Sequence, residues 1–226
     1  MFSLIRRHRA SLLASAAGLV LAGGAARAQV QVPIDPVSTS PAAMAKARTD
    51  SARYPYVEAD IDFMAGMIHH HSQALVMAGW APSHGASSAV QRLASRIINA
   101  QRDEIHLMQQ WLVDRGQPAP PPTPGPMKMK MNGMMMDMLM PGMLSDAQMK
   151  ELDEARGEAF DRKFLTFMIQ HHTGAVGMVN DLFNTYGAAQ DEKIFKFASD
   201  VQIDQTTEIT RMHQMLAAIE LGIAAP

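Results

Sequence analysis

Two related stretches decide the fold of this chain: "DIDFMAGMIHHHSQALVM" at residues 60–77 and "DRKFLTFMIQHHTGAVGM" at residues 161–178. Each stretch places apolar residues at helical spacing around two adjacent histidines. The same residues recur at a constant offset, so the chain contains an internal repeat, which indicates two copies of one structural unit. The matching residues are Asp60 and Asp161, Phe63 and Phe164, Met67 and Met168, Ile68 and Ile169, His70 and His171, His71 and His172, Ala74 and Ala175, and Met77 and Met178.

Each copy continues into a second helix, and that helix also repeats. Ser145 has a glutamine three residues later, as a capping box requires, and Ser88 is followed by Gln91 in the same way. Two helical hairpins with short internal turns pack most simply as an antiparallel four-helix bundle, so the predicted fold class is all-α. The predicted helices span residues 57–80, 88–115, 145–156, 158–183 and 191–219. In the second helices, Gln101, Glu104, Ile105 and Met108 match Gln205, Glu208, Ile209 and Met212.

The chain divides into segments of different composition. "PAPPPTPGP" at residues 118–126 excludes a helix between the two copies, because proline lacks the backbone donor that a helix needs. Few stretches alternate as β-strands do. We expect the two repeats to form one domain. The predicted segments are a signal peptide (1–28), a flexible leader (29–56), the first helical hairpin (57–116), a linker rich in proline and methionine (117–144) and the second helical hairpin (145–221).

The first residues predict export. "MFSLIRRHR" is basic, a short apolar run follows it, and Ala26-Arg27-Ala28 is a small-x-small cleavage signal. The apolar run is shorter than the ~20 residues of a spanning helix, so we expect cleavage before Gln29 and no membrane insertion afterwards. The protein should then be periplasmic or secreted. The Arg6-Arg7 pair leaves the twin-arginine route open beside the general one.

Charge and cysteine content exclude several classes of partner. Cleavage removes four of the 20 basic residues and none of the 22 acidic ones, so the exported chain carries a net charge of about −6. We therefore expect no nucleic-acid partner, since binding nucleic acid requires cationic side chains. The chain has no cysteine and 20 methionines. Any soft ligand to a metal ion would thus come from methionine.

The histidines lie on the face that a helix would bury. At about 100° per residue, His70 falls in the middle of the apolar stripe that contains Phe63, Met67 and Met77, and His71 lies beside it. Glutamine replaces His69 in the second copy, so the pair, and not the triplet, is the motif. Buried histidines at these places have two interpretations: ligands to a metal ion, or core residues bonded to a buried carboxylate.

The polar residues of the second helix in each copy are compatible with both a metal site and a structural histidine–carboxylate pair. A glutamine and a glutamate, Gln101 and Glu104, interrupt the apolar stripe of the first one. Counting back through the turn places Glu104 roughly 10 Å along the axis from His70 at 1.5 Å per residue, so we do not expect a direct contact between these two.

The linker carries a second candidate metal site. Its segment "MKMKMNGMMMDMLMPGM" at residues 127–143 contains nine methionines among seventeen residues, with almost no leucine or isoleucine. Thioethers suit Cu(I) and its mimic Ag(I), and they do not titrate, whereas an imidazole must be neutral to bind. We expect histidine sites to weaken on acidification and thioether sites to persist. The candidate thioether ligands are Met127, Met129, Met131, Met134, Met135, Met136, Met138, Met140 and Met143.

The paired stretches and their Q-x-x-E-I partner helices resemble domain-of-unknown-function family 305 over roughly residues 57–219. The resemblance implies a ferritin-like helical bundle in an exported bacterial protein, and some members of the family are periplasmic copper-binding proteins. The methionine-rich stretch is not part of the family's core pattern. Carried over residue by residue, the resemblance implies a ligand set of His70, His71, Met67, Met77, His171, His172, Met168 and Met178.

Three functions remain open. The first is copper binding, with Cu(I) favoured, for sequestration or transfer in copper tolerance; its partners would be the ion and another exported copper-handling protein. The second is a di-metal oxidase in the same bundle, but such sites use Glu-x-x-His on two helices. This chain has only Asp103-x-x-His106, and its repeat has Thr207 and Thr210. The third is a structural or interaction module without metal. The sequence predicts no catalytic residues and no organic cofactor.

Overall fold

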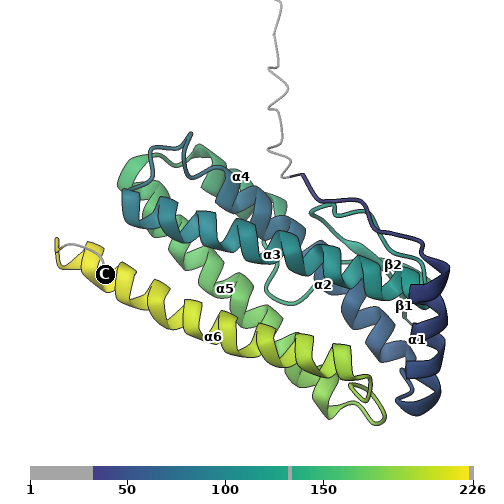
Figure 1. The fold of residues 1–226 in the computed structure, drawn as a ribbon. Helices are drawn as coiled ribbons and strands as arrows, with labels where there is room; N and C mark the ends of the chain where they lie inside the picture. Colours follow the sequence, from purple (N-terminus) through teal and green to yellow (C-terminus); the bar gives the residue numbers. More distant parts are fainter. Residues whose placement is uncertain (1–32, 132–133, 224–226) are drawn as a thin grey trace, which may run out of the picture.

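The computed structural model describes residues 33–131 and 134–223, and these are mostly helical with one small sheet (Figure 1). Four long helices carry the two repeats, and four smaller elements accompany them. The elements in chain order are α1 (Pro41–Arg53), α2 (Glu58–Gly79), α3 (Ser88–Asp114), β1 (Met127–Met131), β2 (Met134–Met138), α4 (Asp146–Glu154), α5 (Gly157–Asn184) and α6 (Glu192–Glu220).

The helices of the repeats begin and end close to the predicted residues. The capping box at Ser145 and Gln148 is confirmed, since each side chain bonds the backbone N–H of the other residue. The predicted box at Ser88 is wrong by one residue. Ser87 is the N-cap, and Gln91 donates instead to the carbonyl of Ala86. Ser87 and Ser88 can both cap a helix through their hydroxyl groups, and the conformation of the preceding turn places Ser87 at the N-cap position.

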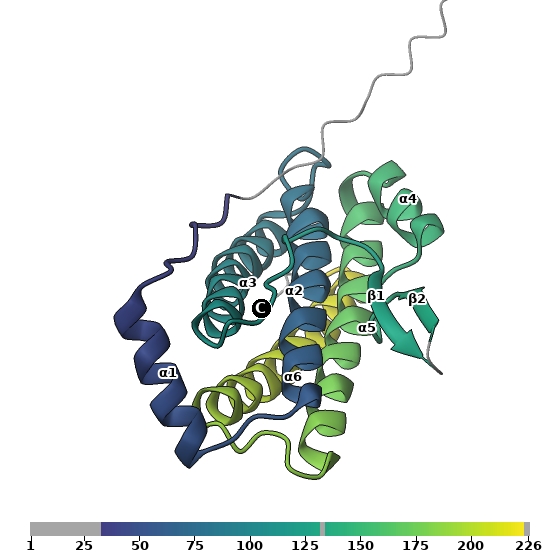
Figure 2. The ribbon, with the colours of Figure 1, turned by 90° about the vertical axis from the view of Figure 1, so that its right-hand side faces the viewer.

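The two hairpins meet through their first helices. Helix α2 packs against α3, α5 packs against α6, and α2 lies against α5. Among the helices that the structure describes, α3 and α6 are not a closely packed pair, and Figure 1 shows α6 diverging from α3. A closed four-helix bundle is therefore not confirmed. The arrangement buries the histidine-bearing helices side by side at the centre (Figure 2).

The repeated aspartates hold the two hairpins together. Asp60 of α2 accepts hydrogen bonds from the backbone N–H of Val57 and, at 2.7 Å, from that of Ala189 in the turn between α5 and α6. Its counterpart Asp161 of α5 accepts from the N–H of Ser87 in the turn between α2 and α3. Each first helix thus anchors the turn of the other hairpin, which relates the two halves by an approximate two-fold axis. Burial raises the pKa of Asp60.

The predicted flexible leader is wrong for most of its described part. Residues 41–53 form α1, with Ser40 as the N-cap and Pro41 in the first turn. Proline is favoured there because its missing N–H would have no helical partner. Ahead of α1, the backbone of Ser38 forms two hydrogen bonds with the side chain of Gln110 in α3. The extended segment before α1 is therefore held against α3. Residues 1–32, with the predicted signal peptide, lie outside the described part of the chain.

The linker qualifies the predicted all-α fold class, because it contains two short strands. Residues 127–131 and 134–138 form two antiparallel strands, the methionine hairpin, which Figure 2 shows beside α5 on the side away from α3. The sequence "MKMKM" alternates as a strand does, and the dipeptide Asn-Gly that follows it is favoured in hairpins. Within the described ranges, none of the helices has the length and apolarity needed to span a membrane.

Candidate metal centre

The two histidine pairs meet between α2 and α5. The ring centroids of His70 and His171 lie 3.7 Å apart. The ring of His71 lies 6.2 Å from that of His70, and the ring of His172 lies 6.1 Å from that of His171. All four side chains, the histidine cluster, belong to residues with no exposed surface. The repeat therefore brings all four predicted histidines to one place in the core.

Each of the four rings has an oxygen atom at its Nε2. Nε2 of His71 lies 2.8 Å from a carboxylate oxygen of Glu104, and Nε2 of His172 lies 2.7 Å from that of Glu208. His70 and His171 approach backbone carbonyls instead. Their Nε2 atoms lie 3.0 Å from the oxygens of Pro141 and of His70, respectively. Carbonyls and ionised carboxylates only accept hydrogen bonds, so these partners assign the proton to Nε2 in all four rings.

The opposite nitrogen of each ring is left without a partner. Nδ1 of all four histidines is buried and has no hydrogen bond among the described residues, and the side chains of Gln101 and Gln205 also contain unpaired atoms. Buried polar atoms are almost always paired in folded proteins. A deprotonated ring nitrogen with its tautomer fixed by an oxygen on the other side is the form in which histidine binds metal ions.

The glutamates bond the flanking histidines and not the central ones. The sequence predicted no contact between His70 and Glu104, and the described residues contain no such bond. Glu104 bonds His71 because Cα–Cβ bonds lean toward the N-terminus of their own helix. In the antiparallel pair α2 and α3, the two side chains lean toward each other and cover the axial separation. The sequence estimate compared only the heights of the Cα atoms and missed this pair.

Burial also changes the acid–base behaviour of the central pair. It lowers the pKa of His70 and of His171 well below 6.5, and the neighbouring imidazoles lower it further. These two rings remain neutral under mildly acidic conditions in which an exposed imidazole takes up a proton. The expectation that histidine sites weaken on mild acidification therefore does not apply to this pair.

Of the four methionines predicted as ligands in the helices, two lie close to the histidine cluster and two do not. Met67 and Met168 precede the central histidines by one helical turn and have no exposed surface. Met77 and Met178 follow them by two turns, about 10 Å along the axis, so they do not share this level of the core. Met178 instead lies near Gly66, where its methyl carbon would be 3.5 Å from an added Cβ. No three His, Asp or Glu side chains of the described chain form a ready-made metal site.

The loop after the methionine hairpin closes the site, and the sequence did not identify its role. Pro141 supplies the carbonyl at His70, and Leu144 bonds both side-chain amide atoms of Gln73, at 2.9 and 2.6 Å. The buried Met140 places its sulfur 2.8 Å from where a Cβ of Gly66 would lie. Gly142 adopts a left-handed conformation with φ +79°, which favours glycine.

This loop approaches α5 closely at one residue. A Cβ on Gly174 would meet the carbonyl oxygen of Pro141 at 2.0 Å and Cα of Gly142 at 2.5 Å. The two glycines Gly142 and Gly174 were the sequence signal for this contact, because such backbone approaches exclude a side chain.

The methionine hairpin carries most of the remaining predicted ligands. Its register pairs Met127 with Met138, Met129 with Met136 and Met131 with Met134. Met134, Met135 and Met136 are 65%, 63% and 48% exposed, whereas Met140 and Met143 lie in the core. Among the predicted methionines with described side chains, three on β2 are thus exposed, Met127 and Met138 are partly buried, and two in the following loop are buried.

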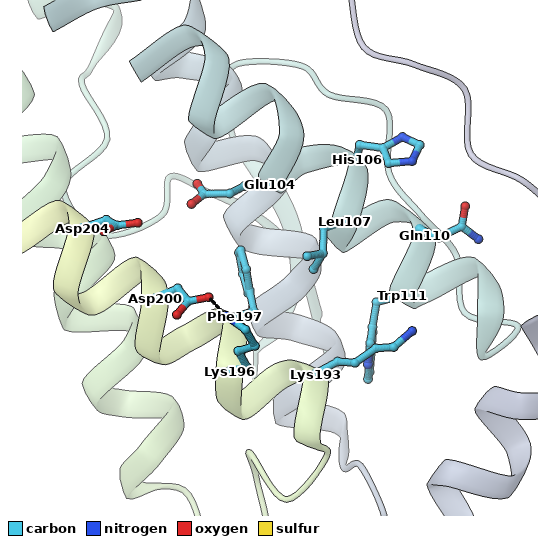
Figure 3. A pocket seen from close by; sticks show the side chains of 10 residues that line it. All are labelled: Glu104, His106, Leu107, Gln110, Trp111, Lys193, Lys196, Phe197, Asp200 and Asp204. Atoms are coloured by element: carbon cyan, nitrogen blue, oxygen red, sulfur yellow. Dashed lines mark hydrogen bonds and ion pairs between the residues drawn. The ribbon is translucent and has the colours of Figure 1, made fainter. Parts of the chain in front are cut away.

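A groove of about 530 Å³ between α3 and α6 reaches the outer side of the cluster (Figure 3). Glu104, Asp200 and Asp204 lie at one end of it, and Leu107, Trp111, Phe197, Lys193 and Lys196 line the rest. Burial raises the pKa of Asp204, and the carboxylates of Glu104, Asp200 and Glu208 raise it further. Asp200 forms an ion pair with Lys196 of the same groove, and Glu104 contacts His71 from this side.

Other polar residues considered from the sequence lie elsewhere. His69 bonds the carbonyl of Thr123 at 2.9 Å and so fixes the linker rather than joining the cluster. His106 bonds the carbonyl of Asp35, and Asp103, with 76% of its side chain exposed, pairs with Arg102. The Asp-x-x-His spacing therefore faces outward.

Comparisons with known structures find the same fold in several proteins. A DUF305 protein from Streptomyces coelicolor is 28% identical, with a TM-score of 0.59 and coverage of 74% of this chain and 96% of its own. A DUF305 fragment from Deinococcus radiodurans is 27% identical, with a TM-score of 0.59 and coverage of 72% and 97%. CopM in its Cu(II)-bound form is 29% identical, with a TM-score of 0.53 and coverage of 70% and 95%. CopM has also been crystallised with Cu(I) and with silver, and both structures match with TM-scores of 0.51.

The sequence comparisons agree. A search of curated proteins finds no match. The family model described as "Domain of unknown function (DUF305)" matches residues 60–216, which include both histidine pairs and both glutamates. This chain therefore belongs to the DUF305 family.

Proposed function

We propose that this protein binds copper at the histidine cluster, with Cu(I) as the favoured ion, and sequesters or transfers it without chemical turnover. One observation carries the proposal: four buried imidazoles each have an oxygen at Nε2 and an unpaired Nδ1. A purely structural histidine–glutamate pair would leave no reason for four unpaired nitrogens in one core.

The donor set fits a soft or borderline ion. Neutral imidazoles bind copper, and thioethers favour Cu(I). Met67 and Met168 lie one turn from the central histidines, so each half offers both kinds of donor. The copper-bound structures of CopM support copper as the ion, since CopM shares the fold and more than a quarter of its residues.

The export compartment supports the same function. The predicted signal peptide directs the chain outside the cytoplasm, and the chain lacks cysteine, which is the strongest soft ligand in proteins. Histidine and methionine then take its place. A role in copper tolerance follows if the bound ion is withheld from other exported proteins, or passed to another exported copper-handling protein.

Anaerobic titration with Cu(I) against a competing chelator tests the proposal. His70→Ala combined with His171→Ala removes the central pair, and the Cu(I) affinity should fall by at least about tenfold, the lower end of the effect of losing even an outer-shell partner. The helical circular-dichroism signal should remain. His69→Ala is the matched control, because its ring bonds Thr123 instead of joining the cluster.

The alternative interpretation predicts a different pattern. If the central histidines only support the core, their loss leaves a cavity and unpaired groups at a cost of ~1–3 kcal/mol per site. An unchanged Cu(I) affinity together with a large drop in melting temperature would refute the proposal and favour a structural module.

A further inference from the structure

Two buried glutamines of the second helices lack partners for their amide groups. Gln101 of α3 and Gln205 of α6 are equivalent in the repeat, and each is 3% exposed. The side-chain oxygen of Gln101 and both side-chain amide atoms of Gln205 are buried without a hydrogen bond in the part of the chain that the structure describes. Burying an amide without a partner costs free energy. Leucine would suit the apolar stripe of each helix without this cost, so the two amides need a chemical reason.

A third buried glutamine shows what a structural role requires. Gln73 is also 3% exposed, yet its amide nitrogen and oxygen bond the backbone of Leu144 at 2.9 and 2.6 Å. Among the side chains that the structure describes, buried polar atoms without a partner belong to Gln101, Gln205, the four histidines of the cluster and Arg115. The unpaired amides therefore share the property that marks the histidine cluster as a site.

The two glutamines lie beside the histidine cluster. Gln101 precedes Glu104 by three residues, so both project from the same face of α3, with Cβ atoms ~5–6 Å apart. The carboxylate of Glu104 in turn lies 2.8 Å from Nε2 of His71. Gln101 is thus one helical turn from the carboxylate that holds a histidine with an unpaired Nδ1. The second half repeats this arrangement around Gln205.

Amide oxygens change which copper ion a site favours. Nitrogen and oxygen donors in tetragonal geometry favour Cu(II), whereas thioethers favour Cu(I), and glutamine replaces methionine as the weak axial ligand in some copper sites. Imidazole binds copper in either state, so the donors beside the imidazoles decide the preference. Here the thioethers of Met67 and Met168 suit Cu(I), and the amide oxygens of Gln101 and Gln205 suit Cu(II).

We propose that Gln101 and Gln205 are oxygen ligands to copper at the histidine cluster, and that they enable the cluster to hold Cu(II) as well as Cu(I). This inference rests on the proposed copper binding and deepens it, because it adds a second oxidation state to the same site. The predicted export places the chain in an oxidising compartment. A protein that binds both ions there keeps copper withheld when its oxidation state changes.

Replacing both glutamines by leucine tests the inference. The variant with Gln101→Leu and Gln205→Leu loses the amide oxygens and keeps the four histidines. Its affinity for Cu(II), measured by competition with a chelator at neutral pH, should fall by at least about tenfold, the lower end of the effect of losing an outer-shell partner. Its anaerobic Cu(I) affinity should stay nearly unchanged. Gln202→Leu is the matched control, because Gln202 lies on α6 as well but is exposed and bonds Asn180.

The stability of the variant without metal provides a second readout. Replacing an unpaired buried amide by an apolar side chain of similar size removes the cost of its unpaired atoms. The melting temperature of the metal-free double variant should therefore rise while its Cu(II) affinity falls. A lower melting temperature would show that the two amides support the core themselves, and it would overturn the inference.

The outcomes separate this inference from the proposed function. An unchanged Cu(II) affinity in the double variant, an equal loss in Gln202→Leu, or no Cu(II) binding by the unmodified protein each overturns the inference and leaves Cu(I) binding standing. The proposed function fails on a different result, an unchanged Cu(I) affinity in the variant with His70→Ala and His171→Ala. A loss of Cu(II) affinity confined to the two buried glutamines supports the inference.

Discussion

Gly174 offers the sharpest test of how the loop at residues 140–144 is held, because the same helix contains its own control. An alanine there would place Cβ 2.0 Å from the carbonyl oxygen of Pro141, and the obstacle is backbone rather than a flexible side chain. At Gly177, one turn later in α5, a Cβ would meet nothing within 4 Å. The two substitutions are chemically identical and differ only in this contact.

The magnitude follows from the bonds that the loop would lose. If the loop moves away, it gives up the bond from His70 to Pro141 and the two bonds between Gln73 and Leu144. At about 1 kcal/mol each, these amount to about 3 kcal/mol, while alanine gains about 1 kcal/mol in helix propensity. Gly174→Ala should therefore destabilise the protein by about 2 kcal/mol. Gly177→Ala should stabilise it by about 0.4–1 kcal/mol.

Urea denaturation followed by circular dichroism measures both values. For a chain of this size, about 2–4 °C of melting temperature corresponds to each kcal/mol, so Gly174→Ala should melt about 4–8 °C lower. The dependence of the free energy on urea should not change, since the surface exposed on unfolding is the same. If Gly174→Ala is stabilised as Gly177→Ala is, the loop is not packed on α5 as described.

Two further predictions concern acid and export. The unfolded chain takes up protons below about pH 6.5 at His70 and His171, whereas the folded chain does not, so the free energy of unfolding falls on acidification by at most about 1.4 kcal/mol per pH unit for each histidine. Urea titrations from pH 7 to pH 4.5 should show a shallower fall when both are alanine, and parallel curves would contradict this. The protein exported by its host should have the mass of a chain that begins at Gln29; recovery from the membrane with residues 1–28 attached would exclude cleavage.

The sequence predicted the elements whose signals are local. Ser145 with Gln148, Gly116 and the prolines after residue 117 each fix a helix end within a few neighbouring residues, so the long helices agree closely with expectation. Two elements were missed although their signals were also local. Ser40-Pro41 is the sequence signal of a helix start, and the dipeptide Asn132-Gly133 after the alternating residues 127–131 is the sequence signal of a hairpin. In both segments the overall composition indicated a flexible chain, whereas the short sequence pattern indicated regular secondary structure.

The site was predictable only in its residue types. The repeat showed that His70 and His171 are equivalent, but the approach of their ring centroids to 3.7 Å depends on how α2 and α5 pack, which no local signal records. The difference between them was also hidden. Nε2 of His171 meets the carbonyl of His70, whereas Nε2 of His70 meets Pro141, because the linker covers only one side of the two-fold axis.

The reciprocal anchoring by Asp60 and Asp161 has a consequence for the origin of the chain. Each half contains an aspartate and also a turn that the aspartate of the other half binds. Two identical halves could therefore form the same pair of hydrogen-bonded contacts that the two unequal halves form here. A self-complementary contact of this kind is the interface of a two-fold dimer. The arrangement is thus that of a dimer whose subunits were fused into one chain. Fusion keeps the two halves at a high effective concentration, and the connection also packs on both of them through its loop at residues 140–144. The connection can thus carry a methionine hairpin, which belongs to neither half of the repeat.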